Sequence, residues 1–262
     1  MNRLDRLFAR KKKDILNIYF TAGYPGLNDT EDIILSLEAA GVDLIEIGMP
    51  YSDPMADGPT IQNSSDVALK NGMTLSILFQ QIKRVRQKTD IPLILMGYFN
   101  QVMQYGEEKF LKKCADVGID GLILPDLPVY VFEENYKDLF EQLDLRISFL
   151  ISPQTSEERI RQIDQLTKGF IYMVSSSSIT GARAGISEEQ MKYFNRINNM
   201  QLNNPRLIGF GISSHQTYAT ACKYSNGAII GSAFIKTLTN SNDIEKAISN
   251  FIKMIRQPIA VE

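Results

Sequence analysis

Short runs of β-branched and aliphatic residues recur along this sequence, separated by loops that lead into segments with helical periodicity. In the helical segments apolar residues return at spacings of three and four, as they do from Leu75 to Val85. Strands that alternate with helices in this way form a parallel sheet. The expected strands are residues 15–20, 42–48, 92–96, 121–125, 145–151, 169–175, 206–211 and 227–231.

Eight such units predict a (β/α)8 TIM barrel, and an open doubly wound sheet is the alternative that the pattern leaves open. The chain has 262 residues, which suits one barrel of about 250 residues. No linker or low-complexity tract divides it, so we expect a single domain over 1–262. Leu4, Leu7 and Phe8 predict an extra N-terminal helix before the first strand.

The charge balance argues against a nucleic acid or an anionic membrane as partner, because 28 basic and 30 acidic residues leave a net charge of -2. No apolar run approaches the ~18 residues that cross a membrane, and the first residues lack the apolar core of a signal peptide. We therefore expect a cytoplasmic protein. Cys114 and Cys222 lie in apolar helical patterns and predict buried thiols. With His215 as the single histidine, no metal site is expected.

Active sites of such barrels lie at the carboxyl ends of the strands, and the second strand carries an acid there. Alternation puts Leu44, Glu46 and Gly48 on one face and Ile45 and Ile47 on the other. The isoleucines should pack against helices, so Glu46 should point into the barrel. An apolar site would raise its pKa and suit it to proton transfer. The alternative is a structural carboxylate bonded to neighbouring backbone.

The loop after this strand, Ser52-Asp53-Pro54-Met55-Ala56-Asp57-Gly58-Pro59, holds two more acids. Asp57 leads towards the helix that contains Ile61 and is the second candidate acid. For either acid the alternative is a helix cap or an Asx-turn, which Asp53 fits well because Pro54 follows it.

Glycine-rich exits follow the last strands, as Gly-Phe-Gly-Ile-Ser at 209–213 and Gly-Ser-Ala at 231–233. The loop after the sixth strand adds Thr180-Gly181 and Gly185. Such exits, opening onto helix N-termini, form the usual phosphate site of these barrels. Each glycine taken alone could equally serve an ordinary tight turn.

At these residues the sequence resembles the tryptophan synthase α subunit family. The signature is Asp-Leu-Ile-Glu-Ile-Gly-Met-Pro-Tyr-Ser-Asp-Pro-Met-Ala-Asp-Gly-Pro-Thr-Ile-Gln at 43–62. Further matches are Tyr-Phe-Thr-Ala-Gly-Tyr-Pro at 19–25, Leu-Met-Gly-Tyr-Phe-Asn at 95–100, Leu-Pro-Asp-Leu-Pro at 124–128 and Ser-Ser-Ile-Thr-Gly-Ala-Arg at 177–183. The resemblance covers essentially the whole chain.

The resemblance implies a lyase that cleaves indole-3-glycerol phosphate to indole and glyceraldehyde 3-phosphate in tryptophan biosynthesis. It implies Glu46 and Asp57 as catalytic carboxylates, with no metal or organic cofactor. The implied substrate contacts are Tyr19, Ile61, Tyr98, Tyr172, Thr180, Gly181, Phe210, Gly211, Gly231 and Ser232.

The resemblance also implies a partner, the pyridoxal-phosphate β subunit, in an α2β2 heterotetramer. Because the loop after the second strand joins Asp57 to the barrel rim, Asp53 and Pro54 are the expected partner contacts.

Three other functions remain open from the sequence. A sugar-phosphate or phosphoribosyl isomerase would share the glycines of the last strands but not the stretch from Glu46 to Gln62. A lyase of the same fold could release free indole without a partner. A non-catalytic subunit that only activates a partner would not need both Glu46 and Asp57.

Overall fold

The computed structural model describes residues 1–174, 187–209 and 211–257. Its strands are β1 (Ile15–Thr21), β2 (Leu44–Gly48), β3 (Leu93–Met96), β4 (Gly121–Ile123), β5 (Arg146–Ile147), β6 (Leu150–Ile151), β7 (Ile171–Val174), β8 (Arg206–Gly209) and β9 (Gly227–Ile230). They form one parallel sheet in the order β5-β4-β3-β2-β1-β9-β8-β7-β6.

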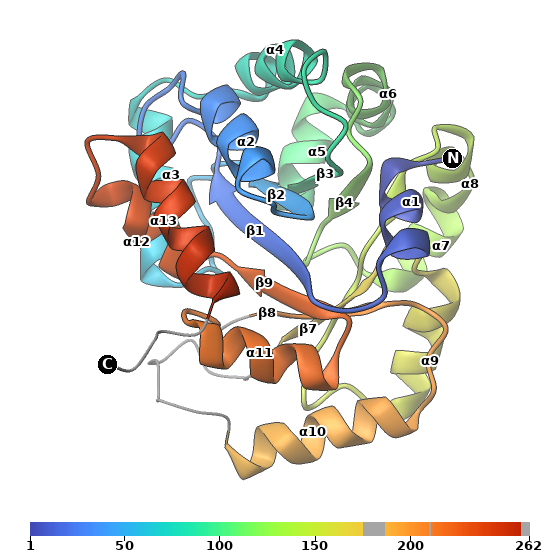
Figure 1. Cartoon of the computed structure of the whole chain (residues 1–262). Coiled ribbons are helices and arrows are strands. Elements are labelled where there is room, and N and C mark those ends of the chain that lie inside the picture. Colours follow the sequence, from blue (N-terminus) through green and yellow to red (C-terminus); the bar gives the residue numbers. More distant parts are fainter. Residues whose placement is uncertain (175–186, 210, 258–262) are drawn as a thin grey trace, which may run out of the picture.

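Figure 1 shows the sheet curling around a common centre with the helices outside it. The first helices along the chain are α1 (Arg3–Arg10), α2 (Thr30–Ala39), α3 (Pro59–Lys70), α4 (Leu75–Val85), α5 (Phe99–Tyr105), α6 (Glu107–Val117) and α7 (Val129–Asn135). The remaining described helices are α8 (Lys137–Gln142), α9 (Glu157–Leu166), α10 (Glu188–Asn199), α11 (His215–Tyr224), α12 (Ser232–Thr239) and α13 (Ile244–Arg256).

The sheet closes on itself because β5 and β6, which stand at its two edges, are consecutive parts of one interrupted strand. The N–H of Ser148 donates to the Leu122 carbonyl at 3.1 Å, on the β4 side. The Phe149 carbonyl accepts from the N–H of Tyr172 at 2.9 Å, on the β7 side. The expected strand 145–151 is thus present but interrupted, and the sheet closes into the predicted (β/α)8 barrel.

Apolar side chains gather on both faces of the sheet, as expected for parallel strands. One cluster joins side chains inside the barrel, including Leu44 and Phe170, with Leu4, Leu7 and Phe8 of α1. A larger cluster fills the space between the strands and the helices. The predicted N-terminal helix therefore covers one end of the barrel interior.

Sequence signals explain some helix boundaries but not all of them. The side chains of Thr74, Ser156 and Ser214 accept backbone N–H groups at the starts of α4, α9 and α11. The helical spacing of Phe132, Tyr136, Leu139, Phe140 and Leu143 predicts one helix, but the structure has two, α7 and α8, which meet at Tyr136 with φ −123°. Helix α5 was not predicted, because its seven residues are too few to show a helical period.

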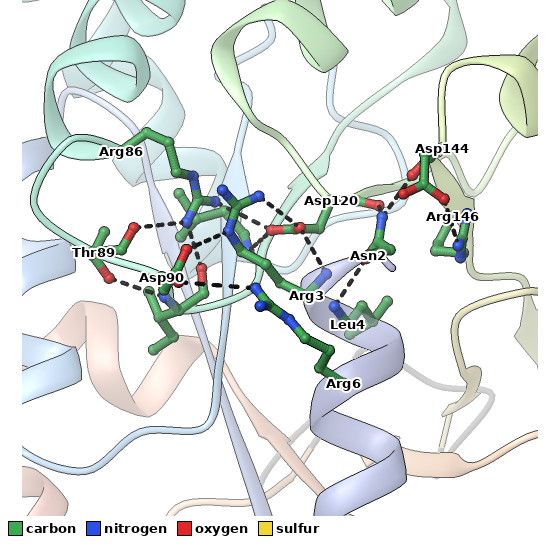
Figure 2. A network of polar contacts seen from close by, with 12 residues as sticks. Asn2, Arg3, Leu4, Arg6, Arg86, Thr89, Asp90, Asp120, Asp144 and Arg146 are labelled. Carbon is green, nitrogen blue, oxygen red and sulfur yellow. Dashed lines mark hydrogen bonds and ion pairs between the residues drawn. The ribbon is translucent and has the colours of Figure 1, made fainter.

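A polar network fastens α1 to the amino ends of the strands (Figure 2). The buried Asp120 carboxylate accepts from Nη1 of Arg3 and Nη2 of Arg86, both at 3.2 Å, and from the N–H of Leu93 at 2.9 Å. The Asn2 side chain donates to the Asp120 carbonyl at 2.9 Å. Burial lowers the pKa of Arg86 to about 10 although Asp120 opposes that shift, so Arg86 depends on its partner.

We expect Asp120→Ala to destabilise the protein by about 3–5 kcal/mol, because it leaves the buried Arg86 cation without its carboxylate. The control is Asp90→Ala: the Asp90 side chain is 77% exposed and accepts from Arg3 at 2.9 Å. That exposed pair should contribute at most about 1 kcal/mol. Urea unfolding of both variants measures the difference, and equal losses of free energy of unfolding would contradict a special role for Asp120.

Candidate active site

Glu46 lies on the inner face of β2, as predicted from alternation. Its neighbour Leu44 belongs to the cluster inside the barrel, whereas Ile45 and Ile47 belong to the cluster between the sheet and the helices. The Glu46 side chain has 0% exposure. Such a carboxylate has lost its water and needs either polar partners or a task.

The Glu46 carboxylate is only half satisfied by the described part of the chain. Its Oε1 accepts a hydrogen bond from Nδ2 of Asn17, and its Oε2 has no partner there. This donor is a side-chain amide, so the alternative of a carboxylate held by neighbouring backbone does not describe Glu46. Burial raises the pKa of Glu46 to about 8, while the Asn17 hydrogen bond lowers that pKa by a smaller amount.

Asp57 sits in the loop between β2 and α3. Its Oδ2 accepts from the Tyr98 hydroxyl at 3.2 Å, and the same hydroxyl accepts from the N–H of Ala56 at 2.9 Å. Helix α3 has Gly58 as its N-cap residue, so Asp57 does not cap it. Burial raises the pKa of Asp57 to about 6 although the Tyr98 hydrogen bond lowers it, which leaves Asp57 mostly ionised at neutral pH.

Two buried tyrosines share the surroundings of both carboxylates. Burial raises the pKa of Tyr19, on β1, and the charges of Asp57 and Glu46 raise it further. Burial also raises the pKa of Tyr172, on β7, with smaller contributions from Glu46, Tyr19 and Asp57. The structure therefore brings together five of the predicted residues, counting Tyr98.

Glycines at two strand ends make room for the tyrosine rings. A Cβ on Gly48 would overlap the Tyr19 hydroxyl, and a Cβ on Gly209 would overlap the Tyr172 ring. The first glycine of the Gly-Phe-Gly run thus has a packing reason that the sequence did not reveal. Its presence alone does not argue for a phosphate site.

The exits of β8 and β9 present the other predicted glycines. Gly211 has φ +77°, and among the described residues no atom beyond its chain neighbours lies within 4 Å of where its Cβ would stand. Gly231 is the N-cap residue of α12 and has no side chain that could accept a hydrogen bond. The backbone N–H groups in the first turn of α12, which begins at Ser232, therefore have no acceptor from the N-cap side chain. Thr180, Gly181 and Phe210 lie outside the described residues.

The loop after β2 connects the predicted partner contacts to Asp57. The Pro54 carbonyl accepts from the N–H of Asp57 at 3.0 Å. The exposed Asp53 carboxylate accepts from the Ser52 hydroxyl at 2.5 Å. Further along, Ile61 lies in the first turn of α3, half-buried against the outer apolar cluster. No described contact joins Ile61 to either carboxylate.

Asn17 is the residue of this site that the sequence analysis missed. It lies on β1 between Ile15 and Tyr19 and, like Glu46, has 0% exposure. The signal was available, because an amide in the apolar run ILNIYF is as unusual as an acid in LIEIG. The role of Tyr98 as a donor to Asp57 was also missed, since 41 residues separate the two in sequence.

The arrangement supplies two carboxyl groups with different proton affinities at one end of a barrel. With pKa values of about 8 and about 6, one is largely protonated and the other largely ionised at neutral pH. Such a pair can act as acid and charge-stabilising base in one reaction. Among the described residues, no three His, Cys, Asp or Glu side chains are grouped so as to hold a metal ion.

Two further expectations concern the chain as a whole. Cys114 and Cys222 are buried free thiols, as predicted. No helix in the described ranges combines the length and the apolar character needed to cross a membrane.

Comparisons with known proteins agree on one family. The family profile described as "Tryptophan synthase alpha chain" matches residues 6–260. The tryptophan synthase alpha chain of Flavobacterium johnsoniae is 58% identical over 256 residues, which are 98% of this chain and 100% of that protein. The alpha chain of Christiangramia forsetii is 57% identical over 256 residues, 98% of this chain and 99% of that protein.

Solved structures give the same answer for the fold. The tryptophan synthase alpha subunit of Legionella pneumophila superposes with a TM-score of 0.87 at 29% identity, over 98% of this chain and 97% of that chain. A chain of the tryptophan synthase complex of Pyrococcus furiosus gives a TM-score of 0.85 at 31% identity, over 94% of this chain and 98% of that chain.

Proposed function

Because this chain belongs to the tryptophan synthase alpha chain family, it cleaves indole-3-glycerol phosphate to indole and glyceraldehyde 3-phosphate, and we propose that Glu46 and Asp57 carry the proton chemistry. The observation that carries this proposal is the buried Glu46 carboxyl with one oxygen free of protein partners in the described chain.

The reaction is a retro-aldol cleavage in which indole C3 gains a proton and the adjacent hydroxyl loses one. Protonated Glu46 donates to C3, and the resulting carboxylate then takes the hydroxyl proton as the carbon–carbon bond breaks. Positive charge develops at the indole N–H in between, and the ionised Asp57 stabilises it. General acid–base catalysis of this kind contributes about 10²–10⁴-fold. Positioning and exclusion of water supply the rest.

The tyrosines and apolar residues would hold the indole and the glycerol chain between the two acids. Tyr19 and Tyr172 are supported in this role by their electrostatic contact with both carboxylates. Tyr98 is supported by its hydrogen bond to Asp57. Ile61 and Phe210 complete the border of the site on the resemblance alone.

The phosphate would lie at the exits of the seventh and eighth barrel strands, β8 and β9. The uncapped start of α12 at Gly231 and Ser232 offers backbone N–H groups and the positive end of a helix dipole. Gly211 adds backbone free of side-chain bulk. Thr180 and Gly181 belong to this site on the resemblance.

The two catalytic assignments are tested by Glu46→Gln and Asp57→Asn. Each keeps shape and hydrogen-bonding capacity but cannot exchange the proton or carry the charge. We expect indole release from indole-3-glycerol phosphate to fall by about 10²-fold or more in each variant. Glu141→Gln, which alters an exposed carboxylate paired with Lys168, is the control. Near-normal turnover of Glu46→Gln in a folded protein would refute its role.

The phosphate site is tested by Gly211→Val, which places a branched side chain where the ligand would approach. We expect weaker binding of glyceraldehyde 3-phosphate and unchanged binding of indole, measured by calorimetry. Gly41→Val is the matched control, because Gly41 also has positive φ (+86°) and open space around its Cβ position. If both variants bind the phosphate ligand equally well, the phosphate lies elsewhere.

The chain would act with a tryptophan synthase β subunit, which condenses indole with serine by means of its pyridoxal phosphate, in an α2β2 heterotetramer. A chain of the Pyrococcus furiosus tryptophan synthase complex has this fold, which supports that assembly. Indole is small and apolar and would escape if released to solvent. The β subunit would contact Asp53 and Pro54. The Pro54 carbonyl accepts from the N–H of Asp57 and so links the rim to the acid. Binding of the β subunit to this loop would hold Asp57 in the position that catalysis requires.

We expect Asp53→Ala to reduce the activation of indole release by added β subunit while leaving the basal rate nearly unchanged. Asp138→Ala, an exposed acid on α8, is the control. Rates are measured with and without β subunit over a range of its concentration. Unchanged activation would remove Asp53 from the coupling, and an equal fall in both rates would make it a local structural residue.

The proposal also includes one domain over residues 1–262 in the cytoplasm. A single closed sheet that uses strands from Ile15 to Ile230 supports one folding unit. A role in tryptophan biosynthesis supports the cytoplasm, where phosphorylated intermediates are handled.

A further inference from the structure

Asn17 and Glu46 form a polar pair inside the barrel. Alternation along β1 places Ile15, Asn17 and Tyr19 on one face, and Ile15 belongs to the interior apolar cluster together with Leu44. In the register of β1 and β2, Asn17 stands opposite Leu44 and Tyr19 opposite Glu46. The Asn17 amide therefore approaches the carboxyl from two residues nearer the amino ends of the strands.

The pair is not explained by stability alone. Both side chains have 0% exposure. Nδ2 of Asn17 donates to Oε1 of Glu46, yet Oδ1 of Asn17 and Oε2 of Glu46 have no partner in the described chain. A half-satisfied buried pair is worse for stability than apolar side chains of the same size. Two leucines here would extend the interior cluster at lower cost.

We propose that Asn17 is a positioning residue for the lyase reaction, which holds Oε1 of Glu46 so that the moving proton is carried on Oε2. This inference rests on the proposed role of Glu46. An N–H donor on Oε1 stabilises negative charge on that oxygen and occupies it. When Glu46 is protonated, the proton therefore resides on Oε2, the oxygen that no group of the described chain engages.

The proton path balances around that one oxygen. The Oε2–H bond breaks as a C–H bond forms at indole C3 with the ring's electron pair, and the nitrogen becomes cationic. The substrate hydroxyl then gives its proton back to Oε2 while the carbon–carbon bond breaks and its electrons neutralise the ring. The acid is regenerated in its starting form, so Glu46 has no need to rotate between the two steps.

Asn17 also keeps both protonation states within reach. Burial drives the pKa of Glu46 upward, and the Asn17 hydrogen bond is the force that opposes it, leaving the pKa at about 8. Without this donor the carboxylate form would become harder to reach. The second step, in which the carboxylate accepts the hydroxyl proton, would then lose its fixed acceptor.

Asn17→Leu is the decisive variant, because it keeps the branched shape at Cγ and removes the donor. Asn17→Thr restores a hydroxyl donor on a side chain suited to a strand. Gln81→Leu is the matched control: Gln81 is a buried amide on α4, donates to the Leu27 carbonyl at 2.8 Å and also has an oxygen without a partner among the described residues. It removes an equivalent buried amide hydrogen bond outside the barrel.

Two measurements are made on each variant. Steady-state rates against pH give kcat and KM, and protonated Glu46 as the starting acid makes activity fall as pH rises through its pKa. The infrared carboxyl band of Glu46 is identified by its absence in Glu46→Gln. Titrating this band gives the pKa of Glu46 directly, without reliance on turnover.

We expect Asn17→Leu to lower kcat by about tenfold to a hundredfold with little change in KM, because the acid is misplaced and not the substrate. The pH at which activity falls on the alkaline side, and the pKa of Glu46 from the infrared titration, should both rise by about one unit, which is a tenfold change in proton affinity. Asn17→Thr should recover part of both effects. Gln81→Leu should lose stability while its pH profile matches the parent protein.

The proposal is wrong if Glu46 titrates at the same pH in Asn17→Leu as in the parent, or if Gln81→Leu reproduces its kinetic loss. Should Asn17→Leu fail to fold, Asn17→Ala removes the same donor without apolar bulk and is judged by the same two criteria. Retained lyase activity in Glu46→Gln would instead refute the proposed function, while the infrared titration would still report on the Asn17 contact.

Discussion

The closure of the parallel sheet is the constraint on which the other properties of this structure depend. At Ser148 and Phe149 the chain bonds to β4 on one side and to β7 on the other, which leaves no open edge at that position. A closed ring has an interior that water does not reach freely, and α1 covers one end of it. Only in such an interior does burial move the pKa of Glu46 from an ordinary carboxyl value to about 8.

The two carboxyl groups differ in pKa because the fold buries them to different extents. Glu46 points into the ring from a strand, whereas Asp57 lies in a loop at its mouth, where burial raises its pKa only to about 6. A carboxyl whose pKa is raised on folding costs stability as it ionises. For Glu46 this cost grows as pH rises from its unfolded pKa to about 8 and is absent at lower pH. The chemistry at neutral pH thus uses a group that is still mostly protonated.

Eight strand–helix units predicted a parallel (β/α)8 barrel but left an open sheet as the alternative. Alternation within the second strand predicted the position of Glu46, since Ile45 and Ile47 mark the outer face. Alternation along the run ILNIYF also puts Asn17 on the inner face, so the sequence carried a signal for this residue as well. The Tyr98–Asp57 contact joins residues 41 positions apart, and no local pattern encodes such a pair. The break between β5 and β6 was equally hidden, because residues 145–151 alternate like a continuous strand.

The two ends of the barrel divide stability and chemistry between them. At the amino ends the Asp120 carboxylate accepts hydrogen bonds from Arg3, Arg86 and Leu93, which offset part of the cost of burying its charge. Deeper towards the mouth, oxygens of Asn17 and Glu46 have no partner in the described chain. Unmet polar groups persist only where the surrounding structure holds them in place. The α1 network and the two apolar layers supply that support, which allows Glu46 to keep one oxygen for a substrate.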